Sequence, residues 1–396
     1  MMVVDYIPDK TDKWLEDEVL PAFRKEHPNI DVEFVYVSWG TLDETVQGYY
    51  AAGEGADIIN LGAEYIAEYG DRLAPLDEYY AGWDGLSQFV PGTMDNVTWD
   101  GKIRGLPWLT APRAYMCRTD ILANAGVTAM PTTFADMVSL VKKVTVVKDN
   151  ALEIKGYQAT GASAMAGSVD WQELVSLIWS LGGSLYKADG TPNFDSAEAR
   201  AALKYARDIH RAEFPDNTIA DLPEATGALL ASNKLACFWG NLWGAPATSD
   251  PIWGQIEFVA GFTSPDFPNG KPVVTVFNDW LGVPSYSKHV KEAAEFLKFL
   301  GSAENLNSYN AAFGSFPPRK DAWTGFVEQD PVMQKMGALM ADYGFPFADV
   351  RASAQLRDIL HAEVTLYLRD EQDLDTTVEN IQTRYTDALR EAGRIP

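Results

Sequence analysis

The sequence predicts an α/β protein with more than one domain, and three observations support that fold class. The first 62 residues alternate between strand-like and helix-like apolar patterns. Such a β-α-β-α-β order implies parallel strands in an open sheet that helices cover on both faces. The chain has 396 residues, which suggests two or three domains at roughly 150 residues each. Its 46% hydrophobic and 22% charged residues are those of a folded protein.

The elements of this first segment can be placed from apolar periodicity. Strands are predicted at residues 3–6, 30–37 and 57–61, because these stretches are rich in β-branched, aliphatic and aromatic side chains. Helices are predicted over residues 11–26 and 41–52, where apolar residues recur at helical spacing. The segment therefore contains three strands and the two helices that connect them.

Later elements are marked by turn and capping residues. Pro21 is expected to kink or restart the first helix. A hairpin turn is predicted at residues 99–102. Thr133 followed by Asp136 resembles a helix N-cap and opens an apolar stretch that continues to Val147. Three further segments have clear helical periodicity, namely residues 197–212, 288–300 and 373–392.

Aromatic residues mark a candidate ligand site. The chain contains 12 Trp, 17 Tyr and 18 Phe, and many Trp residues stand beside Gly, Asn or Pro, a context typical of a cleft lining. In an open parallel sheet, ligands bind beyond the carboxyl ends of the strands, where Trp39 and Glu64 are expected here. The alternatives are that Trp39 packs on the following helix and that Glu64 is a helix-start carboxylate.

Charge and composition exclude several classes of protein. The net charge of −24 argues against a nucleic-acid or anionic-membrane partner. No apolar run reaches the ~20 residues that span a bilayer. The four histidines are scattered, and no dinucleotide, phosphate-loop or calcium-loop motif is present. We therefore expect no metal site and no cofactor.

The two cysteines and the N-terminus bear on the cellular compartment. Cys117 and Cys237 are far apart and each has apolar neighbours, so buried free thiols are expected. The chain begins with a strand-like segment and not with a signal peptide. Either the protein is cytoplasmic or an export signal has been removed.

A set of short segments in a fixed order resembles a known family. It includes Pro28-Asn29-Ile30 after a helix, Gly55-Ala56-Asp57-Ile58, and Asp100-Gly101-Lys102 followed by Gly105-Leu106-Pro107-Trp108. Asn233-Lys234-Leu235-Ala236 and Gly314-Ser315-Phe316-Pro317 follow later in the chain. Over nearly its whole length, the chain resembles the extracellular solute-binding proteins of ABC importers, in the maltose/trehalose-binding-like family.

This resemblance implies a two-lobed periplasmic-binding-protein fold and a transport function. Each lobe would be a mostly parallel sheet flanked by helices, with residues 1–111 and 266–315 in the N-lobe and 112–265 and 316–396 in the C-lobe. The lobes would close about a hinge on a mono- or short oligosaccharide, which the protein would deliver to membrane permease subunits. Such a protein is expected to be a periplasmic or extracellular monomer without catalytic activity. The lipobox cysteine of anchored relatives is not seen, and anchoring stays open.

The resemblance also implies which residues contact the ligand. Trp108 could form an aromatic platform or pack at the hinge, and Arg113 could donate to a hydroxyl or pair across the lobes. Arg351 corresponds to a late arginine of the family, with a surface ion pair as the alternative. Asn278, Asp279 and Trp280 replace a Gly-Gly pair of many relatives and would fill space left for sugar rings. The remaining candidates are Asp9, Trp171, Trp239, Gly240 and Trp243.

Two other functions compete with sugar binding. Aromatic walls with Asp9, Glu64 and Asp279 could instead enclose an amine or another cationic solute, which the acidic surface would attract. A glycoside hydrolase with a carboxylate pair would use a similar aromatic cleft. The sequence contains no recognisable acid and nucleophile motif for the hydrolase.

Overall fold

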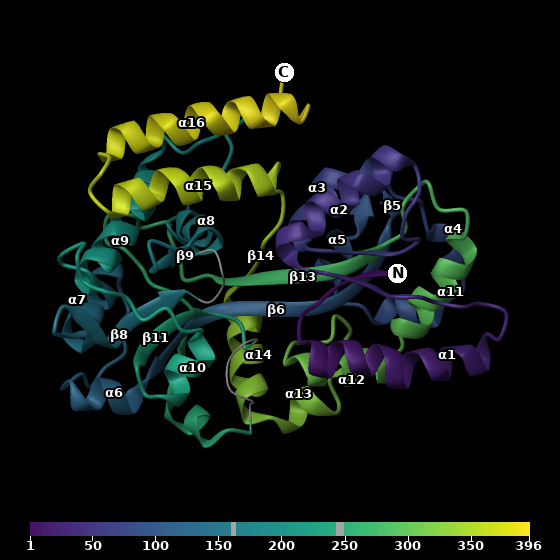
Figure 1. Ribbon diagram of the computed structural model, residues 1–396, viewed down its shortest axis with the longest axis horizontal. Coiled ribbons are helices and arrows are strands. Elements are labelled where there is room, and N and C mark those ends of the chain that lie inside the picture. Colours follow the sequence, from purple (N-terminus) through teal and green to yellow (C-terminus); the bar gives the residue numbers. More distant parts are fainter. Residues whose placement is uncertain (160–163, 243–248) are drawn as a thin grey trace. The chain divides into compact units, whose positions relative to one another are not determined.

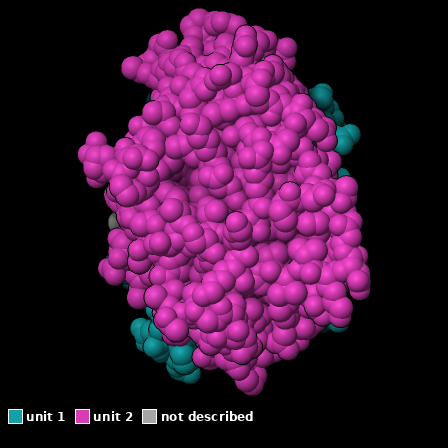
Figure 2. Space-filling view, turned by 90° about the vertical axis from the view of Figure 1, so that its left-hand side faces the viewer, with its two compact units in different colours: residues 1–111, 276–334, 346–350 teal, residues 112–275, 335–345, 351–396 magenta. Residues whose placement is uncertain are grey.

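The computed structural model describes residues 1–159, 164–242 and 249–396 (Figure 1). The chain divides into two compact units, which Figure 2 colours separately. Unit 1 comprises Met1–Ala111, Val276–Gln334 and Pro346–Val350, and unit 2 comprises Pro112–Thr275, Lys335–Phe345 and Arg351–Pro396. Four elements have residues in both units: β6 (Gly105–Arg118), β13 (Val274–Gly282), α14 (Pro331–Tyr343) and β14 (Gly344–Pro346).

Unit 1 is built on the predicted parallel strands. β1 (Met2–Val4) pairs in parallel with β2 (Val35–Val37) and β3 (Ile59–Leu61), and β13 pairs antiparallel with β3. β4 (Thr98–Trp99) and β5 (Lys102–Ile103) form the predicted hairpin. Its helices are α1 (Leu20–Glu26), α2 (Trp39–Ala52), α3 (Ile66–Tyr69), α4 (Asp77–Tyr80), α5 (Pro91–Asp95), α11 (Val290–Leu300), α12 (Ala303–Phe313) and α13 (Phe326–Gln329).

The two elements of unit 1 that differ most from their predicted extent are the first helix and the second strand. The expected helix over residues 11–26 consists of two wide turns, Pro8–Asp12 and Leu15–Val19, followed by α1. Pro21 lies in the first turn of α1, where the missing N–H costs no helical hydrogen bond, so the helix restarts there. The second strand covers Val35–Val37 only, because β1 offers three residues for pairing.

Unit 2 is built on strands that pair with one another and with β6. β6 pairs antiparallel with β11 (Leu235–Gly240) and with β12 (Ile256–Val259), while β11 pairs in parallel with β8 (Ala151–Ala159). β7 (Val146–Lys148) pairs with β8, and β9 (Ala164–Met165) pairs with β10 (Val169–Asp170). The helices are α6 (Thr119–Asn124), α7 (Phe134–Val144), α8 (Trp171–Ser180), α9 (Ala197–Glu213), α10 (Thr226–Ala231), α15 (Ser353–Leu368) and α16 (Leu374–Glu391), the last two lying side by side (Figure 1).

The predicted N-cap at Thr133 is confirmed. The Thr133 hydroxyl accepts a hydrogen bond from Asp136 N at 3.1 Å, and Asp136 Oδ2 accepts one from Thr133 N at 3.1 Å. This reciprocal pair satisfies two N–H groups at the start of α7. The helix ends at Val144 and not at Val147, because the chain turns into β7 after Thr145.

The prediction of free thiols is wrong. Cys117 and Cys237 form a disulfide, with their Cα atoms 4.1 Å apart. Antiparallel pairing of β6 with β11 places the two residues directly opposite each other, and both are buried. Their separation of 120 residues along the chain conceals this proximity at the level of sequence.

In the described parts of the chain, every helix is too short or too polar to traverse a lipid bilayer.

Candidate functional site

Trp39 and Glu64 lie next to each other in unit 1, at the ends of the strands that sequence reasoning selected. Trp39 is the first residue of α2, directly after β2, and Glu64 lies in a short helical turn after β3. Both side chains are half-buried. They meet over Gly62: a Cβ atom placed on this glycine would lie 2.9 Å from Glu64 Oε2 and 3.3 Å from Trp39 Cη2. The carboxylate and the indole edge therefore border the same patch of backbone.

Tyr6 connects this pair of residues to Asp279. The Tyr6 hydroxyl donates a hydrogen bond of 2.6 Å to Asp279 Oδ2, and the Tyr6 ring lies edge-on to Trp39 with ring centres 6.0 Å apart. Asp279 is 8% exposed. Burial, reinforced by the Asp279 charge, raises the pKa of Tyr6 well above its usual value, so the phenol stays a proton donor. Sequence reasoning missed Tyr6, although it follows the first strand at its carboxyl end.

Asn278 and Trp280 point away from Tyr6. Side chains alternate along a strand, so these two residues share the face of β13 opposite to Asp279. The Thr110 hydroxyl donates to Asn278 Oδ1 at 2.8 Å, and Trp280 Nε1 donates to the Gly62 carbonyl at 2.8 Å. Both side chains are buried and act as internal supports of unit 1 in this structure, and their expected place beside the ligand stays a prediction.

Two other candidates of unit 1 make different contacts. Trp108 is fully buried in β6, and its ring centre lies 4.1 Å from that of Tyr309. This arrangement matches the alternative in which Trp108 serves packing. Asp9 lies on the surface, with its side chain 92% exposed, and pairs with Lys13 at 3.2 Å.

In unit 2, Arg113 and Trp239 form the centre of a second cluster. The guanidinium carbon of Arg113 lies 5.2 Å from the Trp239 ring centre, a cation–π distance. Arg113 also donates a hydrogen bond to Gln172 Oε1 at the start of α8. Trp239 is 1% exposed and lies opposite Tyr115, while Gly240 lies opposite Ala114. The cation–π pair holds the guanidinium over the buried indole.

Two buried carboxyl groups lie at the start of α8, and the charge of Arg113 acts on one of them, Asp170. Asp170 caps this helix, because its Oδ1 accepts a hydrogen bond of 2.7 Å from Gln172 N. Glu173 Oε1 accepts hydrogen bonds from the hydroxyls of Tyr115, at 2.9 Å, and Tyr157. Burial raises the pKa of Asp170 to about 6 and that of Glu173 to about 8. Glu173 is therefore a carboxylic acid at neutral pH.

The remaining candidates of unit 2 differ in environment. Trp171 begins α8 and is 5% exposed. Arg351 stacks on Tyr186, with its guanidinium carbon 4.5 Å from the ring centre, and its backbone N–H donates to the Tyr186 hydroxyl at 2.8 Å. Trp243 lies outside the described residues.

Several of the predicted tryptophans are buried in this structure, and their expected contact with ligand stays a prediction. Trp108, Trp239 and Trp280 are among the largest fully buried side chains in the described parts of the molecule. Each lies on a strand flanked by other strands, where side chains are covered by packing on the sheet. Among the predicted tryptophans that the structure describes, Trp39, at a helix start, keeps substantial exposure.

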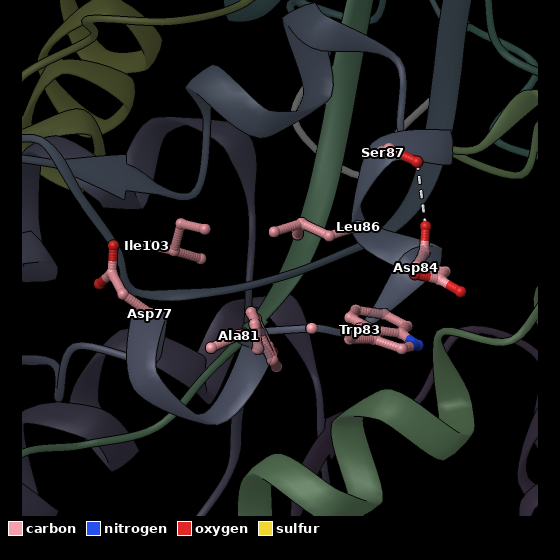
Figure 3. A pocket seen from close by; sticks show the side chains of 9 residues that line it. Asp77, Ala81, Trp83, Asp84, Leu86, Ser87 and Ile103 are labelled. Carbon is pink, nitrogen blue, oxygen red and sulfur yellow. Dashed lines mark hydrogen bonds between the residues drawn. The ribbon is translucent and has the colours of Figure 1, made fainter.

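An open pocket of roughly 550 Å³ in unit 1 involves none of the predicted residues. It is lined by Trp83, Asp77, Asp84 and Ser87, and the Ser87 hydroxyl donates to the Asp84 carbonyl at 3.0 Å (Figure 3).

Within residues 1–159, 164–242 and 249–396, no group of three or more His, Cys, Asp or Glu side chains could hold a metal ion. The candidate site in unit 1 is the Trp39 cluster, which brings together the predicted residues Trp39, Glu64 and Asp279 with Tyr6.

Comparison with known proteins decides the family. Residues 8–306 match the family described as bacterial extracellular solute-binding protein. The chain belongs to this family. Members of the family bind solutes and are not enzymes, and the family name places them outside the cytoplasm.

A sequence relative and two solved structures agree with this membership. A probable ABC transporter-binding protein of Deinococcus radiodurans is 28% identical over 281 residues, which cover 68% of this chain and 66% of that protein. The chain thus matches just under two thirds of that relative's length. The structure titled maltose-bound T. maritima MalE3 has a TM-score of 0.78, with 22% identity and 98% coverage of both chains. A solute-binding protein of Thermotoga lettingae bound with α-D-tagatose has a TM-score of 0.79, with 19% identity and the same coverage.

These likenesses confirm the predicted fold: a mixed α/β protein of the maltose-binding type, with a large sheet flanked by helices.

Proposed function

We propose that this chain is the solute-binding component of an ABC importer and captures a mono- or short oligosaccharide, which it delivers to membrane permease subunits. It works outside the cytoplasm as a monomer. The observation that carries this proposal is the meeting of the Trp39 indole and the Glu64 carboxylate over Gly62. The T. maritima and T. lettingae proteins, which bind maltose and tagatose, support a sugar as the ligand class.

A sugar ring offers two kinds of surface, and the Trp39 cluster complements both. Its C–H face stacks on an aromatic ring, while its hydroxyls donate to carboxylate oxygens. Trp39 supplies the stacking surface, and Glu64 and Asp279 supply acceptors. Tyr6 orients Asp279 through the 2.6 Å hydrogen bond. The sugar stays chemically unchanged, since binding needs no proton transfer.

In unit 2, Arg113 supplies the complementary donor. Its guanidinium is held by the Trp239 ring and by Gln172 Oε1, so little side-chain freedom is lost when it donates to a sugar hydroxyl. A ligand that binds the closed state more tightly than the open state shifts the protein toward closure.

The first test is a ligand panel read by thermal unfolding and calorimetry. Mono-, di- and trisaccharides are compared with polyamines, and a ligand at 100 times its Kd should stabilise the protein by about 2.7 kcal/mol. We expect a shift with at least one saccharide and none with polyamines. The Glu64 and Asp279 carboxylates would also suit a cationic solute, so a shift with polyamines alone would reverse this assignment.

Two further measurements separate the remaining possibilities. Chromatography of oligosaccharides after long incubation should show no cleavage, and release of shorter sugars would indicate a glycoside hydrolase instead. Arg113→Ala should weaken saccharide binding by about tenfold or more, since a charged hydrogen bond is lost. Arg200→Ala is the control, because Arg200 forms an exposed ion pair with Asp375. An Arg113→Ala variant with wild-type affinity would exclude Arg113 from the site.

A further inference from the structure

The backbone conformation of Gly62 does not require a glycine. Its φ of −85° and ψ of 172° are extended values that any residue adopts without strain. The conformational freedom of glycine is therefore not used at this position. A glycine with ordinary dihedral angles is explained either by chance or by a lack of room for a side chain.

The surroundings of Gly62 leave too little space for a side chain. A Cβ atom would approach Glu64 Oε2 to 2.9 Å and Trp39 Cη2 to 3.3 Å, both closer than ordinary van der Waals contact. The atom that gives way is the end of the flexible Glu64 side chain. A methyl group would therefore push the carboxylate off its present position while the surrounding fold stays intact.

The backbone at Gly62 is also held in place. Its carbonyl accepts the 2.8 Å hydrogen bond from Trp280 Nε1, and the Trp280 indole is fully buried. Trp280 pairs with Leu61 in the antiparallel register of β13 and β3. The next step of that register places Asp279 beside Gly62. The strand cannot easily retreat to make room for a side chain.

We infer that Gly62 is a positioning residue for ligand binding: its missing side chain lets the Glu64 carboxylate lie at the edge of the Trp39 indole, where one sugar ring can use both groups. This inference rests on the proposed function and adds a residue to it. Gly62 acts through Glu64 and Trp39. Its replacement lowers affinity without unfolding the protein.

The experiment is a double-mutant cycle on saccharide affinity with Gly62→Ala and Glu64→Gln. G62A should raise the Kd for the saccharide found in the panel by about tenfold, with Tm within about 2 °C of the wild-type value. In the E64Q background, G62A should raise the Kd by less than about threefold, because the displaced group already lacks its charge. Equal effects in both backgrounds, or an unchanged Kd for G62A, would overturn the inference.

The control is Gly48→Ala. Gly48 lies in α2, and a Cβ there would have no atom within 4 Å, so its Kd should stay at the wild-type value. A crystal structure of the G62A variant is a second readout, in which the Glu64 carboxylate should have left the Trp39 edge. A carboxylate found in its original place would contradict the inference. If the wild-type protein binds no saccharide at all, it is the proposed function that fails.

Discussion

Cys117 of β6 lies directly opposite Cys237 of β11, and the two side chains are joined in a disulfide. The same pair of strands carries Arg113 and Trp239, whose cation–π contact lies a few residues away. The covalent link therefore fixes the register on which this contact depends. Disulfides persist in oxidising compartments, which agrees with an extracellular family.

The disulfide should contribute strongly to the stability of unit 2. It closes a loop across a separation of 120 residues, for which the chain-entropy relation gives about 4–5 kcal/mol. Cys117→Ala/Cys237→Ala should therefore lower the Tm by roughly 10 °C or more in calorimetry. Thiol titration of the unfolded wild-type protein is the control and should find no free thiol. An unchanged Tm in the double variant would contradict the predicted contribution.

Trp39 should be required for saccharide affinity and nearly dispensable for folding. Trp39→Ala removes the half-exposed stacking surface, and we expect the Kd to rise by about 10- to 100-fold, at ~1–3 kcal/mol for a lost ring contact. Trp39→Phe keeps an aromatic face and should lose less. Isothermal titration calorimetry measures both variants. Equal losses for Ala and Phe would show that stacking is not the role of Trp39.

The hydrogen bond from Tyr6 to Asp279 should stabilise unit 1. Tyr6→Phe leaves a buried carboxylate without this donor, so the free energy of unfolding should fall by about 1.5–3 kcal/mol, and ligand affinity should fall with it. Tyr36→Phe is the matched control, because the Tyr36 hydroxyl donates to Glu16 at 3.0 Å on the surface. Urea unfolding measures the free energy of unfolding of both variants. Equal losses would show that burial of the Tyr6 hydrogen bond adds nothing to stability.

Glu173 should make stability depend on pH. Burial raises its pKa from 4.5 to about 8, so the folded state binds a proton that the unfolded state releases between these values. Stability from this group is complete below about pH 4.5 and is lost as pH rises through about 8. Glu173→Gln mimics the protonated form. The Tm of this variant minus the Tm of the wild type should therefore increase as the pH rises from 5 to 9, by on the order of 5 °C.

Comparing the Glu173→Gln variant with the wild type isolates the contribution of Glu173 to the pH dependence. Asp170 and Glu213, whose pKa values burial raises to about 6 and about 8, titrate in the same window but are present in both. The effect of Glu213 on the Tm therefore cancels in the difference, while the charge of Asp170, which helps to raise the pKa of Glu173, is part of the measured effect. A Tm difference that stays constant from pH 5 to pH 9 would show that Glu173 does not titrate in this range.

Local sequence signals predicted the elements whose causes are local. The capping pair Thr133 and Asp136 and the alternation of the first strands and helices depend on neighbouring residues, and both were recognisable. The meeting of Trp39 and Glu64 follows from a topological rule for strand ends. The same rule did not indicate Gly62, whose role depends on the side chains around it.

Features created by long-range pairing could not be predicted. The Cys117–Cys237 disulfide depends on strand register, and the Tyr6–Asp279 hydrogen bond joins residues 273 positions apart. The burial of Trp108 and Trp280 depends on what covers each side of their strands, which local composition does not reveal. For Trp243, the expectation of ligand contact stays a prediction.

The path of the chain between the units has a practical consequence for protein engineering. The chain passes from one unit to the other within β6, between Ala111 and Pro112, and within β13, between Thr275 and Val276. No single truncation of the chain would yield a complete unit, because the fragment would contain incomplete strands. A minimal version of unit 1 would instead need residue 111 joined to residue 276 and residue 334 joined to residue 346, with designed turns in place of the residues of unit 2.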